Sequence, residues 1–262
     1  MTEVNYLESL NPLQYESVCS TEGPNLIIAG AGTGKTKVLT TRVAHIIDNN
    51  LAFPSQILCV TFTNKAAREM SERVQKLVSQ NMEKMPWMGT FHSIGAKIIR
   101  NHAEVIGLKQ SFTILDKDDQ LSLIKQIIKA ENLDQSQFSP KLIQSKIDHW
   151  KNKALNPNDI KSESLDNLVD EKSLSIYKIY QARLFEINCL DFGDLLLQCI
   201  NLFKVPDIHK RYSNNFKYIH VDEYQDTNAA QYKWLKLLGS HHQNVCCVAV
   251  SYTHLTLPTT WL

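Results

Sequence analysis

The sequence of 262 residues lacks the features that mark membrane, secreted and disordered proteins. No apolar stretch approaches the roughly 20 residues that a helix needs to cross a bilayer. The start of the chain has neither the basic region nor the apolar core of a secretory signal. Nine glycines and eight prolines are too few for a collagen-like or low-complexity chain. We therefore expect a cytoplasmic protein without a membrane partner.

Neither sign of charge dominates, since 28 Lys and Arg face 27 Asp and Glu and leave a net charge of +1. A globally cationic nucleic-acid binder is excluded, so any site for a polyanion must be a local patch. The six cysteines include no C-x-x-C pair, and most lie in apolar runs. This pattern is typical of buried, reduced thiols and not of a disulfide framework or a zinc site.

Short apolar runs rich in Ile and Val recur along the chain, and each ends at a polar or glycine-bearing corner. Their continuous apolar character is typical of parallel strands that helices cover on both faces. Amphipathic helical patterns follow several of them, which predicts a doubly wound α/β fold. The runs are Leu26–Ala29, Ile57–Thr61, Trp87–Thr90, Tyr218–Val221 and Val245–Val248.

The middle of the chain, from about residue 116 to residue 187, shows no convincing strand. Three sets of apolar residues at helical spacing predict three amphipathic helices instead. They are Leu121, Ile124 and Ile128; Ile143, Ile147, Trp150 and Ala154; and Tyr177, Tyr180, Leu184 and Ile187. We interpret this stretch as a helical subdomain inserted into the α/β core.

A glycine-rich corner follows the first predicted strand and opens a helix, as a phosphate-binding loop requires. Its glycines let backbone N–H groups face an anion, Lys35 can reach the β- and γ-phosphates, and the Thr36 hydroxyl can bind Mg²⁺. Ala29 stands where the strict pattern has glycine, so a corner that binds nothing remains an alternative. The candidate residues for nucleotide binding are Gln14, Ala29, Gly30, Ala31, Gly32, Thr33, Gly34, Lys35, Thr36, Lys37 and Arg42.

An acidic segment follows the strand predicted at Tyr218–Val221. Asp222 fits a carboxylate that binds Mg²⁺ directly or through water, and Glu223 fits the residue that orients and deprotonates an attacking water. Gln225 is placed to sense the γ-phosphate, although an ordinary exposed glutamine is the alternative. We predict Lys35, Asp222, Glu223 and Gln225 as the catalytic group.

Gln14 stands three residues after Asn11, with a proline between them. This spacing is typical of a capping box at the start of a helix. The Gln14 amide could equally read the edge of adenine, because it both donates and accepts hydrogen bonds. The residues alone leave these two roles open.

Six segments in this order resemble the N-terminal half of UvrD/PcrA/Rep-type superfamily 1A DNA helicases: Leu10–Gln14, Ala29–Thr36, Thr61–Ala67, Gly89–Ser93, Leu190–Leu195 and Val221–Asp226. The resemblance implies a RecA-like P-loop NTPase core that uses ATP and Mg²⁺. It makes Gln14 the adenine reader. It also implies 3′-to-5′ movement on single-stranded DNA and unwinding at single/double-strand junctions, in DNA repair or replication.

The same resemblance implies DNA contacts at three corners of the fold. A base could stack on Phe62, although the residues alone favour a core aromatic there. Gly193 stands where the family more commonly has Asp, which weakens the match at the third corner. The residues implied are Thr61, Phe62, Thr63 and Asn64; Thr90, Phe91 and His92; and Asp191 and Phe192.

The predicted domains are a RecA-like core at residues 1–112 and 188–248, with the helical insertion at residues 113–187. From residue 249 to residue 262 the family pattern stops, and we hypothesise a frameshift or foreign junction there. The resemblance implies a second motor domain with arginine fingers, which is absent. We therefore expect this fragment to bind ATP weakly and not to unwind DNA.

Three other functions remain open. The chain could be the helicase part of a recombination helicase-nuclease, or a non-catalytic single-stranded DNA-binding fragment. It could also be a P-loop ATPase that acts on protein, in which case single-stranded DNA would not stimulate hydrolysis.

Overall fold

The computed structural model describes residues 6–30, 32–78, 85–161 and 167–250. The chain divides into two compact units, and each is described by itself. Unit 1 comprises residues 1–94, 210–227 and 238–262, and unit 2 comprises residues 95–209 and 228–237. Among the described residues, no helix is long and apolar enough to cross a membrane.

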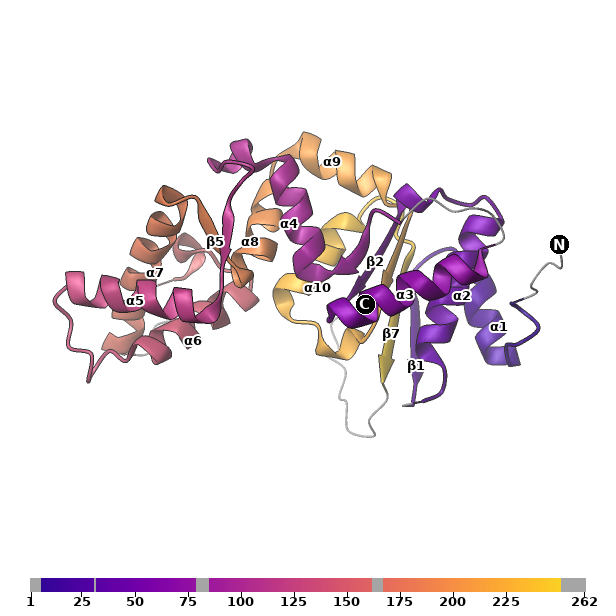
Figure 1. The fold of residues 1–262 in the computed structure, drawn as a ribbon, viewed down its shortest axis with the longest axis horizontal. Helices are drawn as coiled ribbons and strands as arrows, with labels where there is room; N and C mark the ends of the chain where they lie inside the picture. Colours follow the sequence, from indigo (N-terminus) through magenta and orange to yellow (C-terminus); the bar gives the residue numbers. More distant parts are fainter. Residues whose placement is uncertain (1–5, 31, 79–84, 162–166, 251–262) are drawn as a thin grey trace. The chain divides into compact units, whose positions relative to one another are not determined.

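Unit 1 is built on a five-stranded sheet in which every neighbouring pair is parallel. The strand order is β1-β7-β6-β2-β3, so the first and last described strands of the chain lie side by side (Figure 1). The parallel α/β fold predicted from the sequence is confirmed. The strands are β1 (Asn25–Ala29), β2 (Ile57–Thr61), β3 (Met88–Thr90), β6 (Tyr218–Val221) and β7 (Val245–Val250).

The helices α2 (Lys35–Asp48) and α3 (Asn64–Leu77) pack on one face of this sheet. Their apolar stripes meet inward-facing strand residues in one buried cluster, which includes Leu39, Met70 and Val248. α1 (Pro12–Cys19) contacts α2. The short 3₁₀ turns η1 (Pro54–Gln56) and η5 (Tyr224–Asp226) connect elements of this unit.

Strand β7 continues through Ala249 and Val250, which pair with Ile28 and Ala29 of β1. Both residues are apolar and extend the buried strand beyond the expected boundary at residue 248. Residues 251–262 of the expected foreign tail lie outside the described residues.

Unit 2 is mostly helical and has one short parallel pair of strands, β4 (Thr113–Leu115) and β5 (Cys189–Asp191). Its helices are α5 (Lys117–Ala130), α6 (Pro140–Asn152), α7 (Leu168–Glu186) and α8 (Phe192–Leu202), with the turns η2 (Ala103–Ile106) and η3 (Pro157–Asp159). Three further helices carry residues of both units: α4 (Phe91–Asn101), α9 (Pro206–Asn215) and α10 (Ala229–Leu238).

The three helices predicted in the middle of the chain are present as α5, α6 and α7. Their apolar faces form one buried core with residues such as Ile124, Ile147 and Tyr180. The ends of two patterns differ from the prediction. Ala154 lies beyond α6 in a left-handed turn, and Ile187 follows α7 and is 45% exposed.

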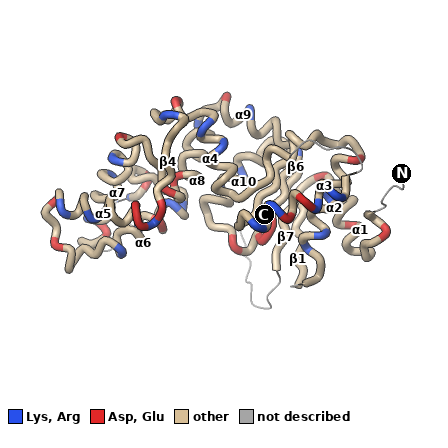
Figure 2. Tube along the Cα trace, viewed as in Figure 1, with Lys and Arg blue, Asp and Glu red and all other residues tan. Residues whose placement is uncertain are grey.

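Basic and acidic residues are mixed along the chain, and neither kind is confined to one part of it (Figure 2). This distribution agrees with the near-zero net charge.

Candidate functional site

The predicted nucleotide and acidic segments of unit 1 leave the same edge of the sheet. Gly30 follows the last residue of β1, and Asp222 follows the last residue of β6, with β7 between the two strands. All these strands are parallel, so their carboxyl ends share one edge. Ligands of open α/β sheets bind at this edge.

The loop after β1 has the backbone that a phosphate-binding loop needs. Gly32 and Gly34 have φ values of 74° and 88°, in the left-handed region that favours glycine. Gly34 is the N-cap of α2. The Lys35 ammonium donates to the Gly30 carbonyl oxygen at 3.0 Å, so the lysine folds back over the loop. Ala31 lies outside the described residues.

Gln14 joins α1 to this loop. Its backbone N–H donates to Asn11 and its side-chain oxygen accepts from the Asn11 N–H, so the predicted capping box is confirmed. Its Nε2 also donates to the Thr33 carbonyl oxygen at 3.0 Å. The cap thus places the Gln14 side chain beside the loop.

Lys37 and Arg42, both predicted to bind nucleotide, donate hydrogen bonds to backbone carbonyl oxygens. The Lys37 ammonium donates to the Ser9 carbonyl oxygen at 2.6 Å. Arg42 is 1% exposed and donates to the carbonyl oxygens of Ser17 and Thr21 at 2.6 and 3.0 Å. Its guanidinium therefore ties α2 to the end of α1, and its role in nucleotide binding stays a prediction.

The acidic segment forms a tight turn at the end of β6. The Asp222 N–H donates to the Val60 carbonyl oxygen, and Asp222 Oδ1 accepts from the Glu223 N–H at 3.1 Å. Glu223 has φ 51° and ψ 46°, an uncommon left-handed conformation for a residue with a side chain. Such strain often occurs at functional sites.

Gln225 connects the Glu223 carboxylate to the sheet. Its Nε2 donates to Glu223 Oε2 at 2.6 Å, and its Oε1 accepts from the Val250 N–H at 3.1 Å. The amide therefore fixes Glu223 against the end of β7, the strand that pairs with β1.

The electrostatics link the two segments. Burial raises the pKa of Asp222 and the neighbouring Glu223 charge raises it further, while the Glu223 N–H and the Lys35 charge act in the opposite direction. The Lys35 charge thus favours the ionised form of Asp222. The corner after β1 and the acidic end of β6 converge on one place.

The corner between β2 and α3 presents polar groups at a helix N-terminus. Thr63 caps α3 by accepting the Ala66 N–H at 3.1 Å, and Asn64 is exposed. Thr61 is 1% exposed and donates to the Thr63 carbonyl oxygen, so it shapes the turn. The Phe62 ring is half-buried and lies 5.4 Å from the Phe91 ring.

The corner between β3 and α4 is more buried than the corner between β2 and α3. Thr90 and Ser93 bond each other's backbone N–H groups, and Phe91 is 1% exposed. Burial lowers the pKa of His92, which favours its neutral form. Of the predicted DNA-contacting residues Thr90, Phe91 and His92, Phe91 is a core side chain.

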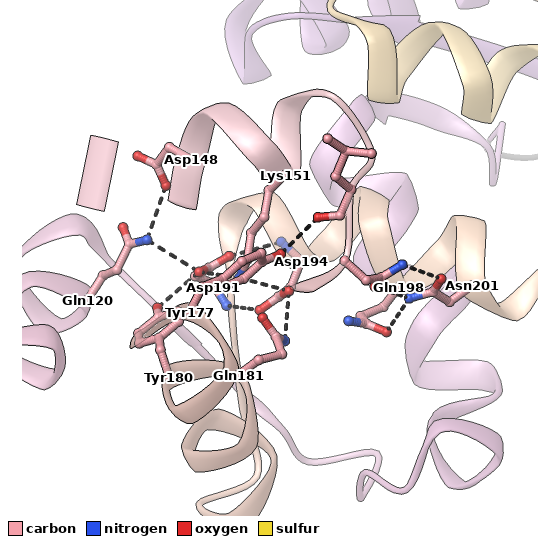
Figure 3. A network of polar contacts seen from close by, with 12 residues as sticks. Gln120, Asp148, Lys151, Tyr177, Tyr180, Gln181, Asp191, Asp194, Gln198 and Asn201 are labelled. Atoms are coloured by element: carbon pink, nitrogen blue, oxygen red, sulfur yellow. Dashed lines mark hydrogen bonds and ion pairs between the residues drawn. The ribbon is translucent and has the colours of Figure 1, made fainter. Parts of the chain in front are cut away.

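In the corner between β5 and α8 of unit 2 (Figure 3), one of the two predicted DNA-contacting residues is buried and the other is exposed. Asp191 is 2% exposed, and its Oδ2 accepts from Lys151 at 2.7 Å and from Tyr180 at 2.9 Å. Phe192, the next residue, is 51% exposed. The Asp191 carboxylate therefore faces the interior, and Phe192 is the exposed residue of the pair.

Comparison with known families identifies the chain. The model for the UvrD/REP helicase N-terminal domain matches residues 10–249. The chain belongs to this family. It is 48% identical over 246 residues to the ATP-dependent DNA helicase PcrA of Staphylococcus aureus, which covers 94% of the chain and 33% of that relative. It is also 48% identical over 252 residues to DNA helicase II of Rickettsia typhi, covering 95% and 38%.

The chain spans about a third of the length of the curated relatives it matches. A probable DNA helicase II homolog of Rickettsia felis gives the same picture, with 46% identity over 93% of the chain and 37% of the relative. The resemblance to UvrD-type helicases inferred from six segments is therefore confirmed.

Lys151, a buried residue of this UvrD/REP domain, was not predicted from the sequence. Lys151 is 1% exposed and lies in unit 2. A signal for it was present, because Lys151 continues the buried stripe of Ile143 and Ile147 at four-residue spacing. A lysine on the apolar face of a helix requires a buried acid as partner.

Proposed function

We propose that the chain is the ATP-binding part of a 3′-to-5′ DNA helicase that hydrolyses ATP to move along single-stranded DNA. The observation that carries this proposal is the convergence of Lys35 and Asp222 at one edge of the sheet in a UvrD/REP family member. Unwinding of junctions belongs to the whole protein and is part of the proposal.

The residues present fit Mg-ATP. Gly32 leaves space above the loop, since a Cβ there would meet nothing within 4 Å. Lys35 and the loop amides would hold the phosphates, and Gln14 would contact the adenine. Thr36 and Asp222 supply the oxygen ligands that Mg²⁺ prefers. When bound, the ion neutralises charge on the phosphates.

Glu223 is the proposed base. Its carboxylate would orient a water and accept its proton, while Lys35 would stabilise the charge on the phosphate oxygens. Gln225 would keep the Glu223 carboxylate in place through the amide contact described above.

We propose that DNA binds at Thr61–Asn64, at Thr90 and His92, and at Phe192. Backbone amides and Asn64 at the start of α3 would hold a phosphate, and the Phe62 and Phe192 rings would stack on bases. Stacking tolerates any sequence, as a motor requires. A RecA-like core with the helices α5–α7 as its insertion remains our proposed organisation.

We propose the cytoplasm as the location. All six cysteines are free thiols, which agrees with a reducing compartment.

A binding experiment tests the nucleotide site. We expect Lys35→Ala to weaken binding of a fluorescent ATP analogue in the presence of Mg²⁺ by at least about tenfold, because a charge-assisted contact of about 1.5–3 kcal/mol is lost. Lys129→Ala, an exposed lysine of α5, is the matched control and should bind as the wild type does. Equal affinity of the Lys35→Ala and wild-type proteins would refute the site.

A second measurement separates the motor from a simple DNA-binding module. In the whole protein, Lys35→Ala should abolish DNA-stimulated ATP hydrolysis and leave single-strand binding largely intact. Hydrolysis that single-stranded DNA does not stimulate would favour an ATPase that acts on protein.

A further inference from the structure

One ammonium group holds both carboxylates of the β5–α8 corner. Lys151 Nζ lies 2.7 Å from Asp191 Oδ2 and 2.9 Å from Asp194 Oδ1, and all three side chains are at most 3% exposed. The remaining oxygens bond backbone N–H groups, since Asp191 Oδ1 accepts from Asp194 and Asp194 Oδ2 accepts from Asp191. The first turn of α8 is therefore held from two sides.

The stem of Lys151 lies directly over Gly193, the residue between these contacts. A Cβ at Gly193 would come within 2.9 Å of Lys151 Cδ and 3.0 Å of Lys151 Cβ. Real Cβ atoms do not approach carbon this closely, so a side chain at Gly193 would displace the lysine. The glycine and the buried lysine thus fit together.

Phe192 is the exception in this segment. It is 51% exposed, whereas Asp191 and Asp194 on either side are 2% and 0% exposed. The ring is therefore exposed on a turn that is anchored by buried carboxylates. A rigid aromatic loses little conformational freedom when a ligand binds.

Lys151 remains charged in this cluster. Burial disfavours its charge, but the charges of Asp191 and Asp194 outweigh that effect and raise the pKa of Lys151. The groups that face the cluster from α5 and α7 are neutral, namely Gln120, Tyr180 and Gln181. A further charge that interacts with Asp191 and Lys151 is Asp148, which accepts from Gln120. Without the ammonium, two buried carboxylates would face each other unpaired.

We propose that Lys151 is a positioning residue that fixes the β5–α8 corner and thereby presents Phe192 as a stacking surface for a base of single-stranded DNA. The inference rests on the proposed function, in which Phe192 contacts the DNA strand. Lys151 itself touches no DNA. It acts through Asp191 and Asp194 on the ring between them.

A double-mutant cycle tests this coupling. The probe is a fluorescein-labelled oligo-dT strand, followed by anisotropy under conditions where circular dichroism shows each variant folded. Phe192→Ala should weaken binding by about 5-fold to about 100-fold, the range for loss of one stacked base. Lys151→Met should weaken it comparably, and the double variant should lose little more than Phe192→Ala alone.

Two further variants complete the design. Lys146→Met removes another ion-paired ammonium of α6, the partner of Asp170, and should leave DNA affinity unchanged. Gly193→Ala displaces the Lys151 stem while keeping every charge. It should weaken binding in the same direction even if Lys151→Met does not fold.

The outcomes separate the two proposals. If the losses from Lys151→Met and Phe192→Ala add fully, the positioning role is overturned. If Phe192→Ala has no effect, or the chain does not bind the strand, the proposed DNA contact at Phe192 fails. In that case, hydrogen exchange tests the positioning role of Lys151 independently of DNA binding. The amides of residues 192–195 should exchange faster in Lys151→Met than in Lys146→Met, and equal protection would overturn it.

Discussion

Two aspartates at the carboxyl ends of parallel strands, Asp222 after β6 in unit 1 and Asp191 at the end of β5 in unit 2, have opposite surroundings. Asp222 is followed by a second acid, and the Lys35 charge influences it from the neighbouring loop. Asp191 is ion-paired with Lys151 and bonded by Tyr180. In our proposal the Asp222 carboxylate binds a ligand, whereas the Asp191 carboxylate is ion-paired inside unit 2. The neighbouring charges therefore distinguish two aspartates at similar strand ends.

The buried cations differ in the same way. Arg42 in unit 1 donates to two backbone carbonyl oxygens, whereas Lys151 in unit 2 binds two carboxylates. Both of these Arg42 hydrogen bonds thus go to backbone oxygens and not to a carboxylate.

The largest expected effect is the loss of the Lys151 ammonium. We expect Lys151→Met to lower the free energy of unfolding by about 3–5 kcal/mol, because two buried carboxylates lose their partner. Urea denaturation followed by circular dichroism measures it. Lys146→Met, which breaks a more exposed pair, should cost about 1 kcal/mol or less. Similar losses in both variants would show that Lys151 is no more important than a surface lysine.

Removal of the buried cation of unit 1, Arg42, should lower the free energy of unfolding by less than removal of Lys151 does. Arg42→Met removes two hydrogen bonds from a charged donor, so we expect a loss of about 2–4 kcal/mol in the free energy of unfolding. Arg73→Met on the exposed side of α3 is the control and should stay within about 0.5 kcal/mol of the wild type. A loss larger than that of Lys151→Met would reverse the comparison between the units.

The pH dependence of stability should differ in sign between the units. Burial and the Asp191 charge raise the pKa of Asp194 to about 6. The native state therefore holds this proton more tightly than the unfolded state does. Stability from Asp194 is complete below the unfolded pKa and is lost as the pH rises through about 6. Asp194→Asn should remove that decline, measured by urea denaturation between about pH 4 and about pH 7.

His220 in unit 1 should act in the opposite direction. Burial, and then the Arg42 charge, lower the pKa of His220 to about 3. Stability from the neutral ring is present above the ordinary pKa and is lost as the pH falls toward about 3. Replacement by glutamine should therefore reduce acid sensitivity. A wild-type slope that His220→Gln leaves unchanged would exclude this residue as its source.

The smallest effect concerns the cap of α1. Asn11→Ala removes the side chain that accepts the Gln14 N–H, and we expect a loss of about 1 kcal/mol. The bond from Gln14 to Thr33 does not use Asn11, so binding of the ATP analogue should change little. A large loss of nucleotide affinity would show that the cap and the loop are one unit.

Much of the fold could be predicted because its signals are local. Buried parallel strands read as continuous apolar runs, and α5, α6 and α7 show helical spacing within their own sequence. The corner at Gly30–Thr36 and the acidic pair Asp222–Glu223 carry their chemistry in a few adjacent residues. Their convergence followed from the rule that parallel strands end at one edge.

The remaining features depend on contacts between distant residues. Asp191 and Lys151 are 40 residues apart, and only the fold brings them together. The direction of the Arg42 side chain depends on where α1 ends, which the sequence of α2 does not contain. The capping role of Gln14 is confirmed and its adenine contact stays a prediction. Its contact with Thr33 was not predicted, because it depends on how the loop folds beside α1.

The left-handed backbone at Glu223 affects how variants of this residue should be interpreted. Glycine there would relax the turn as well as delete the acid, so its phenotype would combine two changes. Glutamine keeps the Cβ and the same conformational demand, and removes only the negative charge. A mutational scan that ranks position 223 by activity alone would confuse relief of torsional strain with loss of the proposed proton transfer, and the glutamine substitution is the one that separates them.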